Sequence, residues 1–594
     1  MNYMQELLDS LFWILKAIGI TAVLFSLTVY VLSLTTRWGK QFWVLAKDYF
    51  SLERSVKPIL YFIIIVFFNL LAVRLDILFS EWYKAMYNAL QEMNESAFWI
   101  QMVIFSVLAS VHIGNLLLTY YLTQRFTIQW RTWLNENMVS KWTENQAYYK
   151  TQHVYHQLDN PDQRIQQDVQ SYVSHSIDFA TGVISSVVSI VAFTTILWKL
   201  SGPMTVGGVS IPHAMVYLVF VYVLVSSVFA FKIGRPLISL NFANERLNAN
   251  YRYSLIRLKE YAESIAFFRG EKMEKSVLFK QFDSVIQNVW QMVYRTLKLS
   301  GFNLVVSQVS VIFPFIIQAA RYFSKQIQLG DLIQTAQAFG RVQTALSFFR
   351  NSYDSFTSYR AVLDRLTGFH SAIELANRLS KTDIQNSDGD VVFKNLTINK
   401  PNGEPLIKKL NLHFPQGSSL LIKGASGAGK TTLLRTVAGL WSYSEGTVRC
   451  PQHNTLFLSQ KPYLPQGRLI DALYYPEVAP ENADLDYAAK LISKVQLGHL
   501  ADKLEQQNDW TRVLSLGEQQ RLSFARVLLH KPIVAFLDEA TASMDEGLED
   551  AMYRLLKAEL PHTTVISVGH RSTLIPHHQQ HLIIDPNDKS WHLA

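Results

Sequence analysis

The sequence predicts a polytopic α-helical membrane domain followed by a soluble α/β domain built around a phosphate-binding loop. Long apolar runs fill much of residues 1–379, and only 17% of the 594 residues are charged, against about a quarter in soluble proteins. Residues 385–594 instead alternate short apolar segments with turn residues. They also contain GASGAGKTT directly after an apolar strand, which is the setting that a phosphate loop requires.

Three regions are expected, because a chain of 594 residues exceeds a single hydrophobic core. Residues 1–57 are predicted to form an additional N-terminal span and a basic cytoplasmic loop. Residues 58–379 should form the main membrane domain and residues 385–594 the nucleotide-binding domain. The boundary is placed at the polar, turn-rich stretch KTDIQNSDGD.

Six segments are apolar and long enough to cross a bilayer, for which a helix needs about 20 residues. They are residues 17–36, 58–79, 96–124, 179–198, 212–231 and 299–320. Residues 1–10, ahead of the first segment, carry two acidic residues and no base, and no small-residue cleavage site ends this first apolar run. We therefore expect a retained span rather than a cleaved signal peptide.

A seventh span follows from topology. The charged segment 232–298 and the nucleotide-binding domain must both face the cytoplasm, so the chain has to return across the membrane after residue 320. Residues 329–356 are the suitable stretch, and a cytoplasmic amphipathic helix is the alternative. Polar residues at spacings of three and four share one face, which is expected to line a cavity: Gln334, Gln337, Arg341 and Thr344.

The distribution of charge fits this topology. The loop 37–57 carries five basic and two acidic residues, as cytoplasmic loops do, which leaves the N-terminus outside. The excursions 125–176 and 232–298 are expected to be helical extensions of the spans. The net charge of +8 is scattered along the chain, so we expect no nucleic-acid partner. The single cysteine, Cys450, excludes an intrachain disulfide and a cysteine-ligated metal cluster.

The phosphate loop matches G-x-x-x-x-G-K-[ST] between a strand and a helix. Its glycines let backbone N–H groups converge on the phosphates of ATP. Lys430 is predicted to reach the β- and γ-phosphates, and the Thr431 hydroxyl to bind Mg²⁺. The predicted nucleotide-binding residues here are Gly424, Ala425, Ser426, Gly427, Ala428, Gly429, Lys430, Thr431 and Thr432.

Further polar side chains follow other apolar strands, at the edge where ligands of open α/β sheets bind. Asp538 and Gln460 are predicted to join Thr431 as Mg²⁺ ligands, in part through water. Glu539, next to Asp538, is the predicted general base for the attacking water. Gln460 and His570 complete the predicted catalytic set.

The segment LSLGEQQR resembles the signature motif of ABC ATPases, through Ser515, Gly517, Glu518 and Gln519. The resemblance implies that these residues contact ATP held by the opposite subunit, so that two identical chains are needed. Two positions depart from the family pattern. Leu516 replaces the first glycine of the motif, and Lys400 stands where an aromatic residue usually stacks on adenine.

The membrane half resembles one ABC subfamily. LDNPDQRIQQDV (residues 158–169) and AESIAFFRGE (residues 262–271) are similar to segments of the peroxisomal fatty-acyl transporters and the bacterial BacA/SbmA-related proteins. The resemblance is strongest to the mycobacterial transporter of cobalamin and hydrophilic antimicrobial compounds. It implies a type IV exporter-like fold, with six core helices plus the extra N-terminal span. It also implies that residues 160–164 and 263–271 couple nucleotide closure to the membrane helices.

The expected function is ATP-driven transport, with ATP and Mg²⁺ as cofactors, by a homodimer in the bacterial inner membrane. A hydrophilic cargo is expected, such as cobalamin-like molecules, polar peptides or antimicrobial compounds, moved inward. Polar residues in the spans support this: Asn69, His112, Asn115 and Gln308, although His112 also fits a packed polar residue. Alternatives are an exporter of lipid or fatty-acyl cargo and an ATP-regulated channel. The C-terminal histidines 562, 577, 578 and 581 fit a solvated tail better than a metal site.

Overall fold

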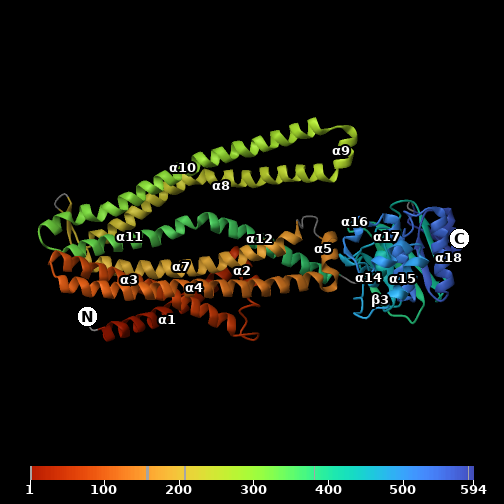
Figure 1. The fold of residues 1–594 in the computed structure, drawn as a ribbon, viewed down its shortest axis with the longest axis horizontal. Coiled ribbons are helices and arrows are strands. Elements are labelled where there is room, and N and C mark those ends of the chain that lie inside the picture. Colours follow the sequence, from red (N-terminus) through yellow and green to blue (C-terminus); the bar gives the residue numbers. More distant parts are fainter. Residues whose placement is uncertain (1–2, 155–159, 207–208, 380–381, 586–587) are drawn as a thin grey trace. The chain divides into compact units, whose positions relative to one another are not determined.

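The computed structural model describes residues 3–154, 160–206, 209–379, 382–585 and 588–594. The chain forms two compact units. The first comprises Met1–Ser140 and Asn160–His370, and the second comprises Lys141–Asp159 and Ser371–Ala594. The first is helical apart from one short hairpin, and the second is an α/β unit, which confirms the predicted fold class (Figure 1).

The helical unit has the following elements: α1 (Tyr3–Thr35), α2 (Arg37–Ala46), α3 (Lys57–Gln91), α4 (Glu95–Thr143), α6 (Pro161–Gln163), the π-helical turn η2 (Arg164–Asp168), α7 (Val169–Leu200), β1 (Met204–Val206), β2 (Val209–Ile211), α8 (Ala214–Glu260), α9 (Ala262–Phe268), α10 (Glu271–Phe323), α11 (Leu329–Asn351) and α12 (Tyr353–Arg378). β1 and β2 pair as an antiparallel hairpin. Within the basic loop expected at 37–57, α2 is a helix that the sequence reading missed.

Within the described ranges, six helical stretches are long and apolar enough to cross a membrane, and they coincide with the six predicted spans. At 47 and 53 residues, α8 and α10 are about 70 and 80 Å long, more than twice the hydrocarbon thickness of a bilayer. The predicted excursion 232–298 is therefore a continuation of these two spanning helices, whereas in the excursion 125–176 the helix α4 continues only to Thr143. Figure 1 shows α8 and α10 side by side, joined at their tips by α9.

The predicted seventh span is a helix, α11, whose 23 residues reach about 35 Å. It packs on α3 through two ion pairs, Arg341–Asp76 at 2.7 Å and Lys84–Asp331 at 2.8 Å. The predicted polar face is only partly open: Gln334 is buried, whereas Arg341 and Thr344 are exposed. One side of that face therefore packs inside the bundle.

Two asparagines expected to favour a hydrophilic cargo are used within the bundle. Asn115 is buried and its amide donates to the Phe68 carbonyl of α3 at 3.2 Å. The Asn69 amide donates to Ile65 of its own helix at 2.8 Å. The His112 ring lies edge-on to Phe79, as a packed polar residue would. Of the four residues, only Gln308 is exposed.

The α/β unit contains α5 (Ala147–Val154), β3 (Asp383–Gln385), β4 (Val391–Asn399), β5 (Pro405–Phe414), β6 (Ser419–Gly424), α13 (Lys430–Val437), β7 (Ser444–Arg449), β8 (Thr455–Leu458), β9 (Gly467–Arg468), α14 (Leu469–Tyr474), α15 (Leu485–Lys494), β10 (Gln507–Asn508), α16 (Trp510–Val513), α17 (Leu516–His530), β11 (Val534–Asp538), α18 (Glu546–Glu559), β12 (Thr564–Val568), β13 (Gln580–Ile584) and β14 (Trp591–Leu593). Short 3₁₀ turns are η1 (Glu144–Gln146), η3 (Gly498–Lys503) and η4 (Ser572–His577).

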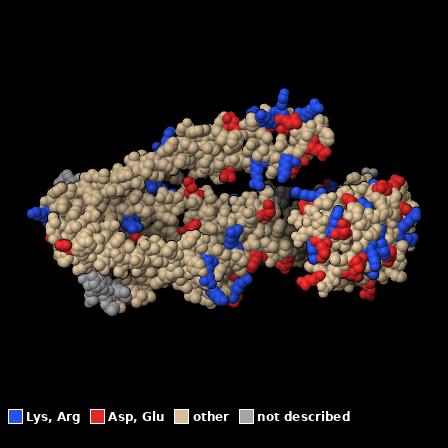
Figure 2. All heavy atoms as spheres, in the orientation of Figure 1, with Lys and Arg blue, Asp and Glu red and all other residues tan. Residues whose placement is uncertain are grey.

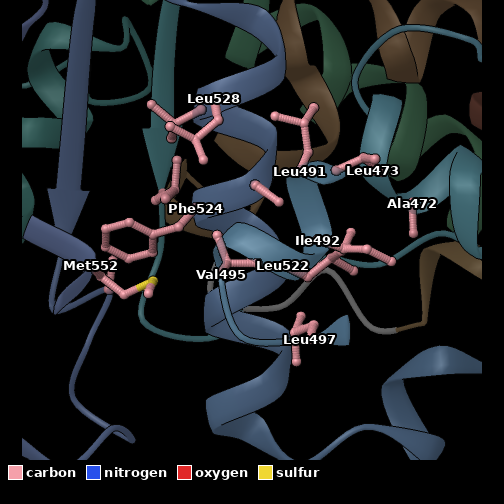
Figure 3. Packing of buried hydrophobic residues seen from close by; sticks show 14 of the residues in the cluster. Ala472, Leu473, Leu491, Ile492, Val495, Leu497, Leu522, Phe524, Leu528 and Met552 are labelled. Carbon is pink, nitrogen blue, oxygen red and sulfur yellow. The ribbon is translucent and has the colours of Figure 1, made fainter. Parts of the chain in front are cut away.

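The main sheet of this unit has the strand order β14-β13-β6-β12-β11-β8, and all neighbours except β13 and β14 are parallel. A second sheet, β3-β7-β4-β5, shares one apolar core with the main sheet. On a separate core, α14, α15 and α17 pack through leucine, isoleucine and phenylalanine side chains (Figure 3). Parallel strands end at the same edge of the main sheet, which brings the loops after β6, β8, β11 and β12 together.

Charged side chains are distributed as a membrane-spanning unit requires. Figure 2 shows few of them over the end of the helical unit remote from α9, whereas both basic and acidic side chains gather near the α9 end of the α8–α10 pair. At that end Phe267 and Phe268 are 78% and 87% exposed. Two aromatic side chains so exposed beside basic residues indicate a surface that binds another protein surface.

Candidate functional site

The phosphate loop joins β6 to α13, between Gly424 and Lys430. Gly424, Gly427 and Gly429 have positive φ values of 153°, 80° and 94°, which a side chain would strain. A Cβ on Gly424 would also lie 2.6 Å from the Ile584 carbonyl oxygen. The loop therefore curls so that backbone N–H groups face one concavity ahead of α13.

Lys430 is buried and folds back over this loop. Its Nζ donates to the carbonyl oxygens of Gly424 at 2.8 Å and Ala425 at 3.0 Å. Burial lowers the pKa of Lys430, and the charges of Glu539 and Asp538 oppose that effect. A phosphate oxygen can replace the two carbonyls as acceptor, because a charge-assisted hydrogen bond is stronger than a neutral one.

Thr431 and Asp538 lie together, as the sequence predicts for two ligands of one Mg²⁺. The Thr431 hydroxyl donates to Asp538 Oδ1 at 3.2 Å. Burial raises the pKa of Asp538, which a bound cation would reverse. A hydroxyl and a carboxylate beside a phosphate cradle are the oxygen donors that Mg²⁺ prefers, so the residues present fit this ion.

Glu539 is held between two of the predicted catalytic residues. Gln460 Nε2 donates to Glu539 Oε2 at 3.0 Å, and His570 Nε2 lies 3.4 Å from Glu539 Oε1. The Glu539 backbone adopts a positive φ of 50°, uncommon for a residue with a side chain. Its N–H donates to the Val568 carbonyl at 3.1 Å. The carboxylate is thus fixed at the edge of the sheet.

The signature segment begins α17. Ser515 is the N-cap residue: its hydroxyl accepts from the Glu518 N–H, and Glu518 in turn accepts from the Ser515 N–H and hydroxyl. Burial raises the pKa of Glu518, but hydrogen bonds from Ser515 and the nearby His499 lower it on balance. A Cβ on Gly517 would lie 2.9 Å from the Ser543 carbonyl oxygen, so that position requires glycine. Leu516, which replaces the family glycine, is exposed.

Gln519 does not face outward with the rest of this segment. Its side chain is 6% exposed, and its amide donates to the carbonyls of Thr511 and Leu514 at 3.0 and 2.8 Å. Within the chain it supports the loop before α17, and its contact with nucleotide stays a prediction. Lys400, at the position where an aromatic residue is expected, lies at the start of a surface turn. Its Nζ pairs with Glu404 Oε2 at 2.8 Å.

One residue that the sequence reading missed connects three parts of the site. Gln520 is fully buried; its Nε2 donates to the Gln460 carbonyl at 2.8 Å, and its Oε1 accepts from the Ser543 N–H at 3.0 Å. It therefore ties α17 to the loop after β8 and to the loop after Glu539. No motif rule singles out this second glutamine.

A segment of the long excursion after α4 also belongs to the α/β unit. Within Lys141–Asp159, the helix α5 buries Ala147, Lys150 and Thr151. Burial raises the pKa of Tyr149, and the charge of Arg435 on α13 lowers it. Within the excursion 125–176, the segment near the phosphate-loop helix α13 is thus α5. This helix precedes the predicted coupling residues 160–164.

The prediction of a solvated tail is wrong for two of the C-terminal histidines, although His562 is exposed. His578 is buried, with Nδ1 2.8 Å from the Leu574 carbonyl and Nε2 2.8 Å from the Ser567 hydroxyl. His577 pairs with Asp550 at 3.0 Å. These rings pack on α18 and β12 because η4 turns the chain back over the sheet, a tertiary effect that composition cannot reveal.

Two family models match the chain. One describes an ABC transporter transmembrane region and matches residues 45–323; the other describes the ABC transporter ATP-binding region and matches residues 407–542. A bacterial Atm1-family ABC exporter with ATP bound has the same fold, with a TM-score of 0.67 and 16% identity over 90% of this chain and 94% of that one.

Relatives extend over almost the whole chain. An ABC transporter ATP-binding protein of Haemophilus influenzae is 62% identical over 98% of both chains. The inner membrane ABC transporter ATP-binding protein YddA of Escherichia coli is 30% identical over 89% of this chain and 94% of its own. The chloroplastic ABC transporter D family member 2 of Arabidopsis thaliana is 28% identical over 94% and 88%. The chain therefore belongs to the ABC transporter family, as a multi-pass membrane protein with a cytoplasmic ATPase domain that drives transport.

Proposed function

We propose that two copies of this chain form an ATP-hydrolysing transporter that moves hydrophilic solutes inward across the bacterial inner membrane. The observation that carries the ATPase part is the arrangement around Glu539, which Gln460 and His570 contact from two sides. In this proposal Glu539 is the general base, and the other two residues orient its carboxylate and the attacking water. Thr431, Asp538 and Gln460 would hold Mg²⁺, which would supply charge stabilisation at the phosphates.

The second copy completes each nucleotide site. One chain carries one phosphate loop and one signature segment, and the capping box at Ser515 leaves the start of α17 at the surface. Two chains related by a two-fold axis place each signature opposite the partner's phosphate loop. The exposed Phe267 and Phe268 and the predicted coupling residues 263–271 would then contact the partner's ATPase domain, while α5 contacts its own.

Exposed polar residues on α11 favour a polar cargo. Arg341 and Thr344 are exposed on a helix long enough to span the bilayer, and Arg341 pairs with Asp76 at 2.7 Å. An ion pair within a membrane-spanning helix pair is costly unless it faces water or other polar groups. This supports an aqueous cavity and a polar cargo, such as a cobalamin-like molecule, a polar peptide or an antimicrobial compound.

A lipid or fatty-acyl cargo is the second candidate, favoured by the D family relatives and by the loss of Asn69 and Asn115 to internal hydrogen bonds. Transport and ATPase measurements on the homodimer in lipid vesicles distinguish a polar cargo from a lipid or fatty-acyl cargo. ATPase stimulation and uptake by cobalamin or a polar peptide, but not by acyl-CoA, supports the first. The reverse pattern overturns it. If cargo only equilibrates across the membrane and never accumulates against its gradient, in the parent protein as in Glu539→Gln, the protein would be a channel.

A further inference from the structure

The N-terminal helix α1 stands partly away from the rest of the helical unit. Only 6% of its most apolar window is buried, the same fraction as in the stretch that contains α4, compared with 39% for α3. Between α1, α2, α3, α7 and the α11–α12 junction lies a cavity of about 1010 Å³. Its wall includes Trp13 and Phe25 of α1, Phe42 of α2 and Phe179 of α7. The additional helix therefore encloses a groove against the core.

The groove follows the length of the bilayer. Its lining on α7 runs from Ser176 to Lys199, which at 1.5 Å per residue is about 35 Å, close to the thickness of the hydrocarbon layer. Along this stretch the lining residues recur every three or four positions and are mostly apolar, as in Val183, Val187 and Val191. One continuous apolar face of α7 is thus turned toward α1.

Charge is confined to the end of the groove that is remote from α2. Among the described residues, the lining there includes Lys16, Arg74 and Lys199 together with the acidic Glu81. Arg74 is buried and its Nε donates to the Ser10 hydroxyl at 3.1 Å. Lys16 and Lys199 are exposed, and neither forms an ion pair within the described part of the chain. Among the described residues, Lys16 and Lys199 thus bring two ammonium groups without a carboxylate partner to this end of the groove.

A lysine at Lys16 is unusual, because it interrupts the apolar run of a spanning helix. An ammonium group inside a bilayer is costly unless it reaches water or an opposite charge. Lys16 lines the groove together with Lys199. An anion bound between the two would remove that cost for both.

We propose that this groove binds an anionic phospholipid of the surrounding membrane. Its phosphate lies between Lys16 and Lys199, and an acyl chain follows the α1–α7 wall toward Phe179. The lining from Val183 to Val191 offers no hydrogen-bonding side chains. Flexible acyl chains need none to fill a narrow apolar groove. The site is distinct from the exposed polar face of α11.

Quenching of Trp13 tests this proposal, because the side chain lines the groove. The homodimer is reconstituted in nanodiscs that contain either phosphatidylglycerol or phosphatidylcholine with a dibrominated acyl chain. The Trp13 contribution is the difference in quenching between the parent protein and Trp13→Phe. We expect stronger quenching by brominated phosphatidylglycerol at equal lipid fraction.

The Lys16→Gln/Lys199→Gln variant should reduce the preference for phosphatidylglycerol, by roughly fivefold in apparent affinity for each lysine. Lys490→Gln/Lys503→Gln, which removes the same charge from exposed positions of the α/β unit, should leave it unchanged. Equal quenching by the two lipids overturns the proposal, as does an unchanged preference in the first variant. A cross-link from Val187→Cys to the partner subunit would also overturn it, by showing that protein fills the groove.

Discussion

Gln520 donates its buried amide to the backbone carbonyl of Gln460 at 2.8 Å, and so connects the signature helix to the loop that holds Glu539. The same side chain accepts from the Ser543 N–H. One amide thus fixes the spacing of three loops around the site. Rearrangement of the signature segment must move Gln460, and with it the general base.

Replacing Gln520 should impair hydrolysis more than binding. In Gln520→Leu the Gln460 carbonyl and Ser543 N–H lose their partner inside the domain, at a cost of about 1–3 kcal/mol. We expect kcat to fall roughly tenfold or more, with KM for ATP changed less than threefold. The exposed Gln506→Leu serves as the matched control. An unchanged kcat in a folded Gln520→Leu homodimer would contradict this role.

Removing the carboxylate of Glu539 should nearly abolish turnover. General-base catalysis contributes about 10²–10⁴-fold, so Glu539→Gln is expected to lower kcat by at least 100-fold while ATP still binds. Phosphate release and equilibrium nucleotide binding are measured on the same reconstituted sample. Glu481→Gln, at an exposed position, should behave like the parent. Substantial turnover in Glu539→Gln would assign the base elsewhere.

His578 should make the ATPase domain acid-sensitive. Burial lowers its pKa to about 4, below the ordinary 6.5, so the unfolded chain binds this proton more tightly. The stabilisation is complete above pH 6.5 and is lost as the pH falls toward 4, by on the order of 3 kcal/mol. His578→Gln should flatten the pH dependence of thermal unfolding in that window. The exposed His453→Gln should not, and a parallel pH profile for both variants would refute the assignment.

Asp168 should be a stabilising residue of the helical unit. It is 3% exposed and accepts from Arg365 Nη2 at 2.6 Å, Arg365 Nε at 2.8 Å and Arg164 Nη1 at 2.9 Å. Asp168→Asn leaves these guanidinium groups without their counter-charge, and breaking such a pair costs about 3–5 kcal/mol. We expect a clear fall in the unfolding temperature, measured against the exposed Asp162→Asn. Equal unfolding temperatures would show that the pair contributes nothing net.

The sequence was most informative where function depends on neighbouring residues. The phosphate loop at Gly424–Thr432 and the Asp538–Glu539 pair lie at strand ends that apolar patterning locates, and the structure places them side by side. The six apolar spans followed from length and composition in the same way. These features are local, so a linear reading reaches them.

Features that depend on tertiary packing were missed or misjudged. Gln520 matters only because Gln460 and Ser543 meet it in space. His578 looks like a surface residue within HHQQH but is covered by η4 and β12. The helix α5 lies in a polar stretch whose association with the α/β unit leaves no periodic signal. The sequence predicts that Asn69 and Asn115 favour a hydrophilic cargo, but their amides donate to the helix carbonyls of Ile65 and Phe68.

Disulfide trapping between Ser426→Cys and Leu516→Cys tests most directly whether two chains share each nucleotide. The native thiol, Cys450, is buried, so background oxidation should be small. In a Glu539→Gln background, ATP and a mild oxidant should convert the double variant to a covalent dimer, while each single variant stays monomeric on a denaturing gel. Only monomer in the double variant, with ATP bound and the protein folded, would contradict the account.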